Sequence, residues 1–183
     1  VISDCDNVVI KDCEFVGDKG NGVCILNASM VRIENCNFSL SYGEGVTVVE
    51  NKYGIVTIHN NSFKRCHLAL KSLGQNSIKI TNNYFLTYSS AFKFLPSVSL
   101  GEMNGAQKVE IRYNLFDECC KDEGIATVVI AGYDESYSHR QISLLENIFS
   151  QSKRAVIHAK GVKCLTFKEN SVKTNDESTV ENS

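Results

Sequence analysis

The sequence predicts an all-β protein, a right-handed parallel β-helix of about seven coils. Three observations lead to this prediction. One hexapeptide returns seven times along the 183 residues, and six of its copies end in Phe. The copies are 22 to 33 residues apart, a period typical of solenoids. Short β-branched runs broken by Asn, Gly and Asp take the place of long helical periods.

The copies are described in chain order, because each should mark one coil. They read IKDCEF (10–15), IENCNF (33–38), IHNNSF (58–63), ITNNYF (80–85), IRYNLF (111–116), LLENIF (144–149) and FKENSV (167–172). Each copy is entered by an alternation such as VRI or VTI, whose outer residues point inward and whose middle residue points outward. We therefore expect the Ile and Phe positions to stack in columns, with ~4.8 Å between coils.

A second strand is expected after the bend that follows each Phe. These segments read GVCIL, GVTVV, LALKSL, AFKFL, IATVVI and AVIHA. Two or three short strands per coil with no helix between them are typical of a parallel β-helix. We expect the β-helix to span residues 1–173 and a polar tail to span residues 174–183.

One polar position inside the repeat carries a structural prediction. Two residues before the final aromatic, the coils read Cys13, Cys36, Asn61, Asn83, Asn114, Asn147 and Asn170. An Asn amide both donates and accepts hydrogen bonds, and Asn tolerates a left-handed bend. We expect these side chains to stack as an amide ladder from one coil to the next.

Composition excludes several function classes. The formal charge of −2 gives no electrostatic footprint for nucleic acid, and no run of 18 apolar residues could span a membrane. The chain opens in a strand-like pattern without an initiator Met or a signal-peptide pattern, so we expect either preceding sequence or a partner to cover the first coil. We predict a secreted, cell-surface or periplasmic protein.

The eight cysteines show no C-x-x-C or other metal or redox spacing. We interpret them as free, mostly buried thiols. Cys13 and Cys36 are near enough to bridge, but stacked side chains that point the same way make poor disulfide geometry. No cofactor is predicted. Ca²⁺ is possible at scattered acidic residues, although no motif indicates it.

Insertions are where a solenoid usually places chemistry. The two long spacings mark insertions at 95–107 and, in two parts, at 117–124 and 131–141. A carboxylate pair near an Arg or His is what glycosidic bond cleavage requires, although adjacent acids also arise because loops are polar. The candidates are Glu102, Asp117, Glu118, Asp122, Glu123, Asp134, Glu135, His139 and Arg140.

Outward-facing strand positions offer a second set of candidates. Lys79 should lie beside Glu110, and His59 beside Glu34, with Arg112 in the same column as His59. These side chains could line a saccharide groove, or they could be ordinary cross-strand pairs. His67 and His158 are interpreted as packed. Outward aromatics would support sugar binding: Tyr42, Tyr53, Tyr88, Tyr133 and Tyr137.

The Ile-x-Asn-Asn-x-Phe coils resemble the pectate-lyase-like superfamily of right-handed β-helices. Within it, the chain is similar to the α-1,3-galactosidase family that trims blood-group-B-type glycans. The similarity rests on residues 90–119, 138–149 and 155–172. It implies a glycoside hydrolase acting on galactose-containing or other acidic or neutral polysaccharides, with a polysaccharide or glycan as partner.

The acidic catalytic motif of that family would fall on SYGEGVTVVE (41–50). There the paired acids are replaced by Gly43 and Glu44, so only Glu44 keeps a carboxylate. The candidate catalytic residues are therefore Glu44, Asp18, Asp134 and Glu135. The candidate substrate-binding residues are His59, Lys79, Glu110, Arg112, Glu102, His139 and Arg140.

Two hypotheses stay open. One is a carbohydrate-active enzyme, a glycoside hydrolase or a polysaccharide lyase. The other is a non-catalytic β-helix that binds glycans or has an adhesive or structural role, including as a fragment of a larger enzyme. Two carboxyls that converge in one groove would favour the first hypothesis.

Overall fold

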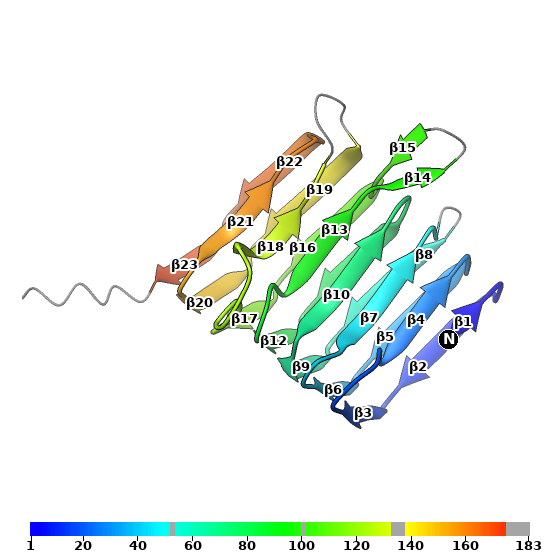
Figure 1. The fold of residues 1–183 in the computed structure, drawn as a ribbon, viewed down its shortest axis with the longest axis horizontal. Coiled ribbons are helices and arrows are strands. Elements are labelled where there is room, and N and C mark those ends of the chain that lie inside the picture. The colour runs from blue at the N-terminus through cyan, green and yellow to red at the C-terminus, as the bar shows by residue number, and fades with distance from the viewer. Residues whose placement is uncertain (52–53, 100–101, 133–137, 175–183) are drawn as a thin grey trace, which may run out of the picture.

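The structure is a computed structural model that describes residues 1–51, 54–99, 102–132 and 138–174. Over these residues the chain winds through three parallel sheets of seven strands, named here sheets A, B and C (Figure 1). Each coil adds one strand to each sheet. The predicted right-handed parallel β-helix of about seven coils is confirmed, with three strands per coil.

The strands succeed one another in the order A, B, C around each coil. Sheet A contains β1 (Ile2–Ser3), β4 (Val23–Leu26), β7 (Glu44–Val49), β10 (Leu68–Leu73), β13 (Phe92–Leu95), β18 (Ala126–Ile130) and β21 (Ala155–Ala159). Sheet B contains β2 (Val8–Lys11), β5 (Met30–Glu34), β8 (Ile55–His59), β11 (Ser77–Thr81), β16 (Lys108–Arg112), β19 (His139–Leu145) and β22 (Val162–Lys168). Sheet C contains β3 (Glu14–Gly17), β6 (Asn37–Leu40), β9 (Ser62–Cys66), β12 (Tyr84–Thr87), β17 (Leu115–Asp117), β20 (Ile148–Ser152) and β23 (Ser171–Thr174).

The two insertions leave the coils in different ways. Part of the 95–107 insertion forms an antiparallel hairpin of β14 (Ser97–Ser99) and β15 (Glu102–Asn104), which projects from the rod (Figure 1). The 117–124 segment instead stays close to the coils, at the corner after β17. Of the predicted polar tail, only Thr174, the end of β23, is among the described residues.

The core consists of the predicted columns. In sheet C, Phe15, Phe38, Phe63, Phe85, Phe116 and Phe149 stack in that order, with ring centroids 4.7, 4.5, 5.1, 5.0 and 4.6 Å apart. In sheet B, Ile10, Ile33, Ile58, Ile80, Ile111 and Leu144 pair in register. Period-2 alternation therefore sets the register, because a slip of one residue would turn both columns outward.

The predicted amide ladder forms from Asn61 to Asn170. The Asn83 Oδ1 accepts from the Asn61 backbone N–H at 2.8 Å, and the Asn83 Nδ2 donates to the carbonyls of Ile58 and Thr81 at 2.9 Å each. The same pattern continues through Asn114 and Asn147. In the second coil Cys36 occupies the ladder position, and its thiol contacts the Glu34 carbonyl at 3.2 Å.

Each residue just before this ladder turns the corner between sheets B and C in the left-handed region. Its φ is 54° at Asp12, Asn35 and Asn60 and 57° at Asn82. Asn and Asp adopt this conformation with less strain than other non-glycine residues. The two residues of each NN pair in the repeat thus have different roles. The first residue adopts the left-handed bend, and the second joins the ladder.

All eight cysteines are free, as predicted. Cys36, Cys66, Cys119 and Cys120 are buried, whereas Cys5, Cys13 and Cys164 are exposed. Burial raises the pKa of Cys66 to about 11. The prediction that most thiols are buried therefore holds for four of the eight.

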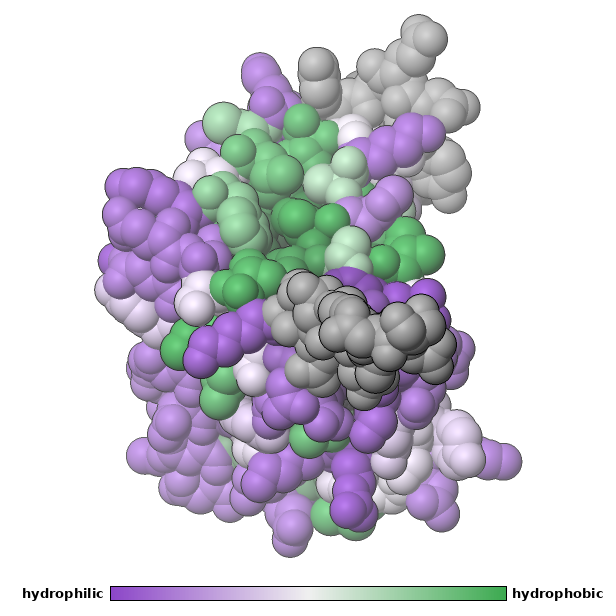
Figure 2. Space-filling model, turned by 90° about the vertical axis from the view of Figure 1, so that its left-hand side faces the viewer, coloured by the Kyte–Doolittle hydropathy of each residue, from purple (hydrophilic) through white to green (hydrophobic). Residues whose placement is uncertain are grey.

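The last coil differs from those before it. Its inward-facing residues remain partly accessible, with exposed fractions of 41% at Leu165, 43% at Phe167 and 44% at Val172. Figure 2 shows apolar residues gathered at this end of the rod. In the middle coils the equivalent positions, such as Ile80 and Phe85, are buried.

Candidate functional site

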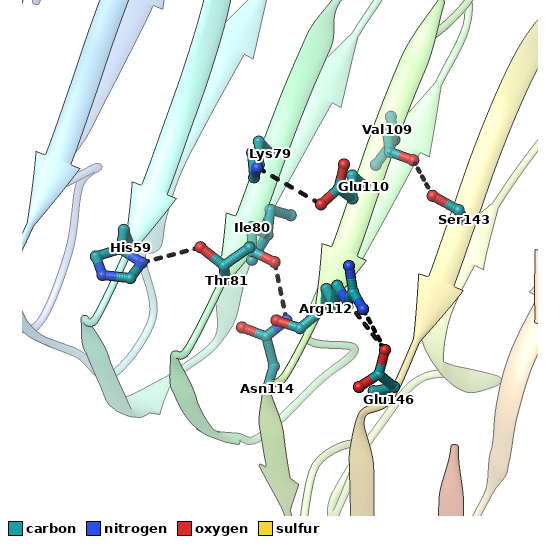
Figure 3. Close-up of polar contacts among 10 residues, drawn as sticks. All are labelled: His59, Lys79, Ile80, Thr81, Val109, Glu110, Arg112, Asn114, Ser143 and Glu146. Carbon is teal, nitrogen blue, oxygen red and sulfur yellow. Dashed lines mark hydrogen bonds and ion pairs between the residues drawn. The ribbon is translucent and has the colours of Figure 1, made fainter. Parts of the chain in front are cut away.

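The outward face of sheet B gathers four of the candidate binding residues (Figure 3). Lys79 pairs in register with Glu110, and His59, Thr81 and Arg112 follow one another on neighbouring strands. These are the two outward columns that the alternation predicts. The face is therefore a continuous polar surface along the rod.

Polar contacts on this face are already satisfied within the protein (Figure 3). The Lys79 Nζ lies 3.6 Å from the Glu110 Oε1, and the His59 Nδ1 lies 2.9 Å from the Thr81 Oγ1. Arg112 donates through two guanidinium nitrogens to Glu146, and this hydrogen bonding lowers the pKa of Glu146. Such partly exposed pairs contribute at most about 1 kcal/mol each, so the face resembles ordinary cross-strand pairing.

A cleft lies at the next corner, where sheet C leads into sheet A. We name it the corner cleft; its volume is about 460 Å³. Its lining residues come from the segments that follow β3, β6, β9, β12 and β17. They are Asp18, Ser41, Tyr42, His67, Tyr88, Asp122 and Glu123. Five successive coils thus contribute to one hollow, which suits an extended ligand better than a small compact one.

Backbone hydrogen bonds fix the walls of the corner cleft. The Tyr42 N–H donates to the Asp18 carbonyl at 2.9 Å, which stacks the first two bends. The N–H groups of Asp122 and Glu123 both donate to the Tyr88 carbonyl, at 3.0 and 3.3 Å. The 117–124 insertion therefore folds back over the preceding coil. A Cβ at Gly43 would meet the Gly20 carbonyl oxygen at 1.9 Å, so this close approach of two bends requires glycine.

The side chains of the corner cleft combine three carboxylates, an imidazole and two phenols. The His67 Nδ1 lies 3.6 Å from a Glu123 carboxylate oxygen, and both side chains are partly exposed. Tyr42 is 75% exposed. Carboxylates and imidazoles serve as general acids and bases, and exposed phenol rings offer both an apolar face and a hydroxyl. The arrangement can therefore bind a polyhydroxylated ligand and hold groups able to move protons.

Sequence reasoning anticipated part of this cleft. Asp18, Asp122 and Glu123 were candidate acids, and Tyr42 and Tyr88 were candidate aromatics. His67 was interpreted as a packed residue, but it lines the cleft. The signal that could have identified it is its position in the bend between β9 and β10, which corresponds to the bend of Tyr42 one coil earlier.

Glu44 lies on sheet A outside the group that lines the corner cleft. Its carboxylate accepts from the Lys71 Nζ at 2.8 Å and from the Thr47 hydroxyl. Thr47 in turn accepts from Asn21 at 3.1 Å. The half-buried Glu44 is therefore the centre of a small polar network. Its catalytic role stays a prediction.

The remaining candidates are dispersed. Arg140 is exposed on β19, and Glu102 begins β15 in the hairpin. Asp134 and Glu135 lie outside the described residues, as do Tyr53, Tyr133 and Tyr137. Arg140 is not among the residues that line the corner cleft, and the proposed roles of all these residues remain predictions.

His139 is fully buried, and both of its ring nitrogens bind backbone. The Nδ1 accepts from the Ala106 N–H at 3.1 Å, and the Nε2 lies 3.1 Å from the Ala131 carbonyl. A backbone N–H can only donate, so the ring must be neutral with its proton on Nε2. His139 thus links the end of the first insertion, at Ala106, to the 131–141 segment of the second.

We expect the stability of the protein to fall as the pH drops from 7.5 to 5. Burial lowers the pKa of His139 in the folded state. A depressed histidine pKa means that its contribution is complete above the unfolded value of ~6.5 and is lost as the pH falls below it. Urea unfolding at several pH values measures this effect. His139→Gln should flatten the profile between pH 7 and 5; an unchanged profile would contradict the assignment.

The fold first defines a class, the parallel β-helix proteins. Residues 1–104 match the family model described as "Periplasmic copper-binding protein (NosD)". This match covers more than half of the chain, and the chain belongs to the NosD family. The predicted secreted, cell-surface or periplasmic location agrees with that description. The described residues include no helix that could cross a membrane.

Other comparisons are more distant. No curated protein matches the chain. A solved structure, the A-module of the mannuronan C-5 epimerase AlgE6 from Azotobacter vinelandii, is similar with 13% sequence identity and a TM-score of 0.47. The match covers 92% of this chain and 58% of that module, so the chain spans less than two thirds of its length. The narrower resemblance to the α-1,3-galactosidase family is not supported by these comparisons.

The family description raises the question of copper. Among the described residues, no group of three or more His, Cys, Asp or Glu side chains could hold a metal ion. The stacked thiols of Cys13 and Cys36 are soft donors, but each is hydrogen bonded to a backbone carbonyl, and burial raises the pKa of Cys36. The described residues therefore do not fit a copper centre. The predicted absence of a cofactor stays a prediction.

Proposed function

We propose that the protein binds a glycan in the corner cleft. The observation that carries this proposal is the convergence of Tyr42, Tyr88, His67 and three carboxylates on one hollow of about 460 Å³. Aromatic faces and polar groups with both donors and acceptors are what a polyol requires. The cleft runs along the rod, and this direction favours a chain of sugars.

The charge of the cleft selects among glycans. Asp18, Asp122 and Glu123 are acidic, and among the described residues that line the cleft only His67 can become cationic. Their shared negative potential disfavours polyuronates and sulfated chains. We therefore propose neutral, galactose-containing oligosaccharides, in line with the resemblance of residues 90–119, 138–149 and 155–172 to the α-1,3-galactosidase family.

Binding of galacto-oligosaccharides tests this proposal by calorimetry and glycan arrays. Tyr42→Ala and His67→Ala should each weaken binding at least ~10-fold, as expected when a central contact is lost. Val16→Ala is a matched control, because Val16 is 70% exposed on β3 and is not among the residues that line the cleft. Unchanged binding by both cleft variants, or no binding of any glycan to the wild-type protein, would contradict the proposal.

Glycoside hydrolysis is a second candidate function. It is favoured because carboxylates from two different coils, Asp18 and the pair Asp122 and Glu123, line the same cleft. Asp18 comes from the first coil, and Asp122 and Glu123 come from the fifth. Hydrolysis requires one carboxyl group as acid and another as base or nucleophile. If the protein is an enzyme, Asp18→Asn and Glu123→Gln should each lower hydrolysis ~100-fold or more while binding persists. Full activity in both variants would exclude this pair.

A further inference from the structure

Tyr113 occupies a position where the other coils place small or flexible polar residues. It turns the corner between sheets B and C with a φ of 57°, as Asn35, Asn60 and Asn82 do at 54° to 57°. A bulky aromatic residue is a rare occupant of the left-handed region, because its Cβ crowds the backbone there. Strain that persists in a fold often accompanies a functional requirement. Tyr113 is therefore a candidate for a functional residue.

The surroundings of Tyr113 hold its ring in place. The Arg112 guanidinium lies 4.5 Å from the ring centroid, and Arg112 is itself fixed by Glu146. Even so, the side chain of Tyr113 remains accessible, with 47% of the residue exposed. A preorganised ring with accessible surface can stack on a ligand without a further cost of ordering.

The ring stands at one end of a shallow hollow that we name the amide groove, of about 580 Å³. It follows the corner between sheets B and C over four coils and is lined by Asn35, Cys36, Asn37, Asn60, Asn61, Ser62, Asn82, Asn83, Tyr84, Tyr113 and Leu115. None of these side chains carries a formal charge at neutral pH. The amide groove and the corner cleft lie at opposite ends of the sheet C strands.

The exposed amides of the groove form a second, outer array. The Asn60 Nδ2 donates to the Asn35 Oδ1 at 2.7 Å, and the Asn35 Nδ2 donates to the Asp12 Oδ1 at 3.2 Å. These bonds orient the amides and leave part of their donor and acceptor capacity facing solvent. Because Asn35, Asn60 and Asn82 occupy this corner in three successive coils, the array repeats there at the ~4.8 Å strand spacing.

We propose that the amide groove is a second glycan-binding site, for an extended neutral oligosaccharide that stacks on Tyr113. Uncharged amides suit hydroxyl groups, the repeated spacing suits a polymer, and the aromatic ring gives the apolar face of a sugar a platform. The site shares no residue with the corner cleft and does not depend on it.

Tyr113→Asn tests this inference, because it introduces the residue that the three preceding corners carry at Asn35, Asn60 and Asn82. We expect the melting temperature to stay equal or to rise by ~2–4 °C as backbone strain is relieved. Binding of galacto-, cello- and chito-oligosaccharides of four to six units should weaken at least 10-fold at the groove. Two-dimensional NMR of the Asn side-chain amides measures binding at this site separately from the corner cleft. Asn60→Gly keeps the left-handed bend and should also weaken groove binding.

The possible outcomes separate the two sites. Shifts of the groove amides that disappear in Tyr113→Asn but persist in Tyr42→Ala support the inference. Groove amides that do not respond to any of these oligosaccharides overturn it, even if the corner cleft binds. A Tyr113→Asn protein that binds as the wild-type does overturns it as well. Loss of cleft binding alone, in Tyr42→Ala, concerns only the proposed function.

Discussion

Replacing Asn83 with Leu is expected to lower the free energy of unfolding by roughly 3–6 kcal/mol. Asn83 is 97% buried and joins three coils. Leu would leave the Asn61 N–H and the Ile58 carbonyl without the Asn83 side chain, whereas the Thr81 carbonyl would keep its bond from the Asn60 N–H. Each buried unsatisfied group costs about 1–3 kcal/mol, and the apolar gain of Leu is small beside that sum.

Urea unfolding followed by circular dichroism measures this change in the free energy of unfolding. Two further variants provide reference values for it. Asn83→Cys should fall between wild type and Leu, because the Cys36 thiol in the equivalent position still contacts the Glu34 carbonyl. Asn82→Gly should be nearly neutral, since Asn82 is exposed and Gly accepts its φ of 57°. A Leu variant within 1 kcal/mol of wild type would show that the ladder contributes little.

The sequence predicts the coils well because each coil meets the same constraints. Ile58 and Phe63 must point inward and Asn61 must satisfy backbone groups of its neighbours, so the residue types recur with the contacts. The cross-strand neighbours follow directly: Lys79 beside Glu110 and His59 beside Glu34 are confirmed by the register. Contacts that recur from coil to coil therefore require residue types that recur along the sequence.

The insertions could not be predicted in the same way. Their positions were evident from the long spacings, but nothing in the residues 95–107 indicates that part of them forms an antiparallel hairpin, whereas 117–124 folds back. Glu123 meets His67 across 56 residues of sequence only because that return brings the insertion over earlier coils. The sequence identified Asp18 as a candidate acid. It did not predict which residues line the cleft together with Asp18.

The corners show an intermediate case. The left-handed bend was expected of the second Asn of each NN pair, together with the ladder role. In the structure the first residue bends and the second joins the ladder, because the ladder amide must point inward while a left-handed residue turns its own side chain outward. Tyr113 could be recognised as unusual only once the bend was assigned to its position.

Phe116→Ala is expected to lower the free energy of unfolding by about 3–5 kcal/mol, as is typical of a large aromatic truncated in a core. Phe116 is 1% exposed and stacks between Phe85 and Phe149 at 5.0 and 4.6 Å. It also meets the edge of Phe92 from sheet A at 5.3 Å, so its removal opens a void between two sheets.

The adjacent residue supplies the control for this substitution. Leu115 points outward from the same strand and is 37% exposed, so Leu115→Ala should cost less than ~1 kcal/mol. Guanidinium unfolding of both variants measures the contrast, and the slope of the transition reports whether coils unfold together. Because a solenoid contacts only neighbouring coils, a void in the fifth coil should also lower cooperativity and broaden the transition. Equal stabilities for the two variants would show that the Phe column is not what holds the coils in register.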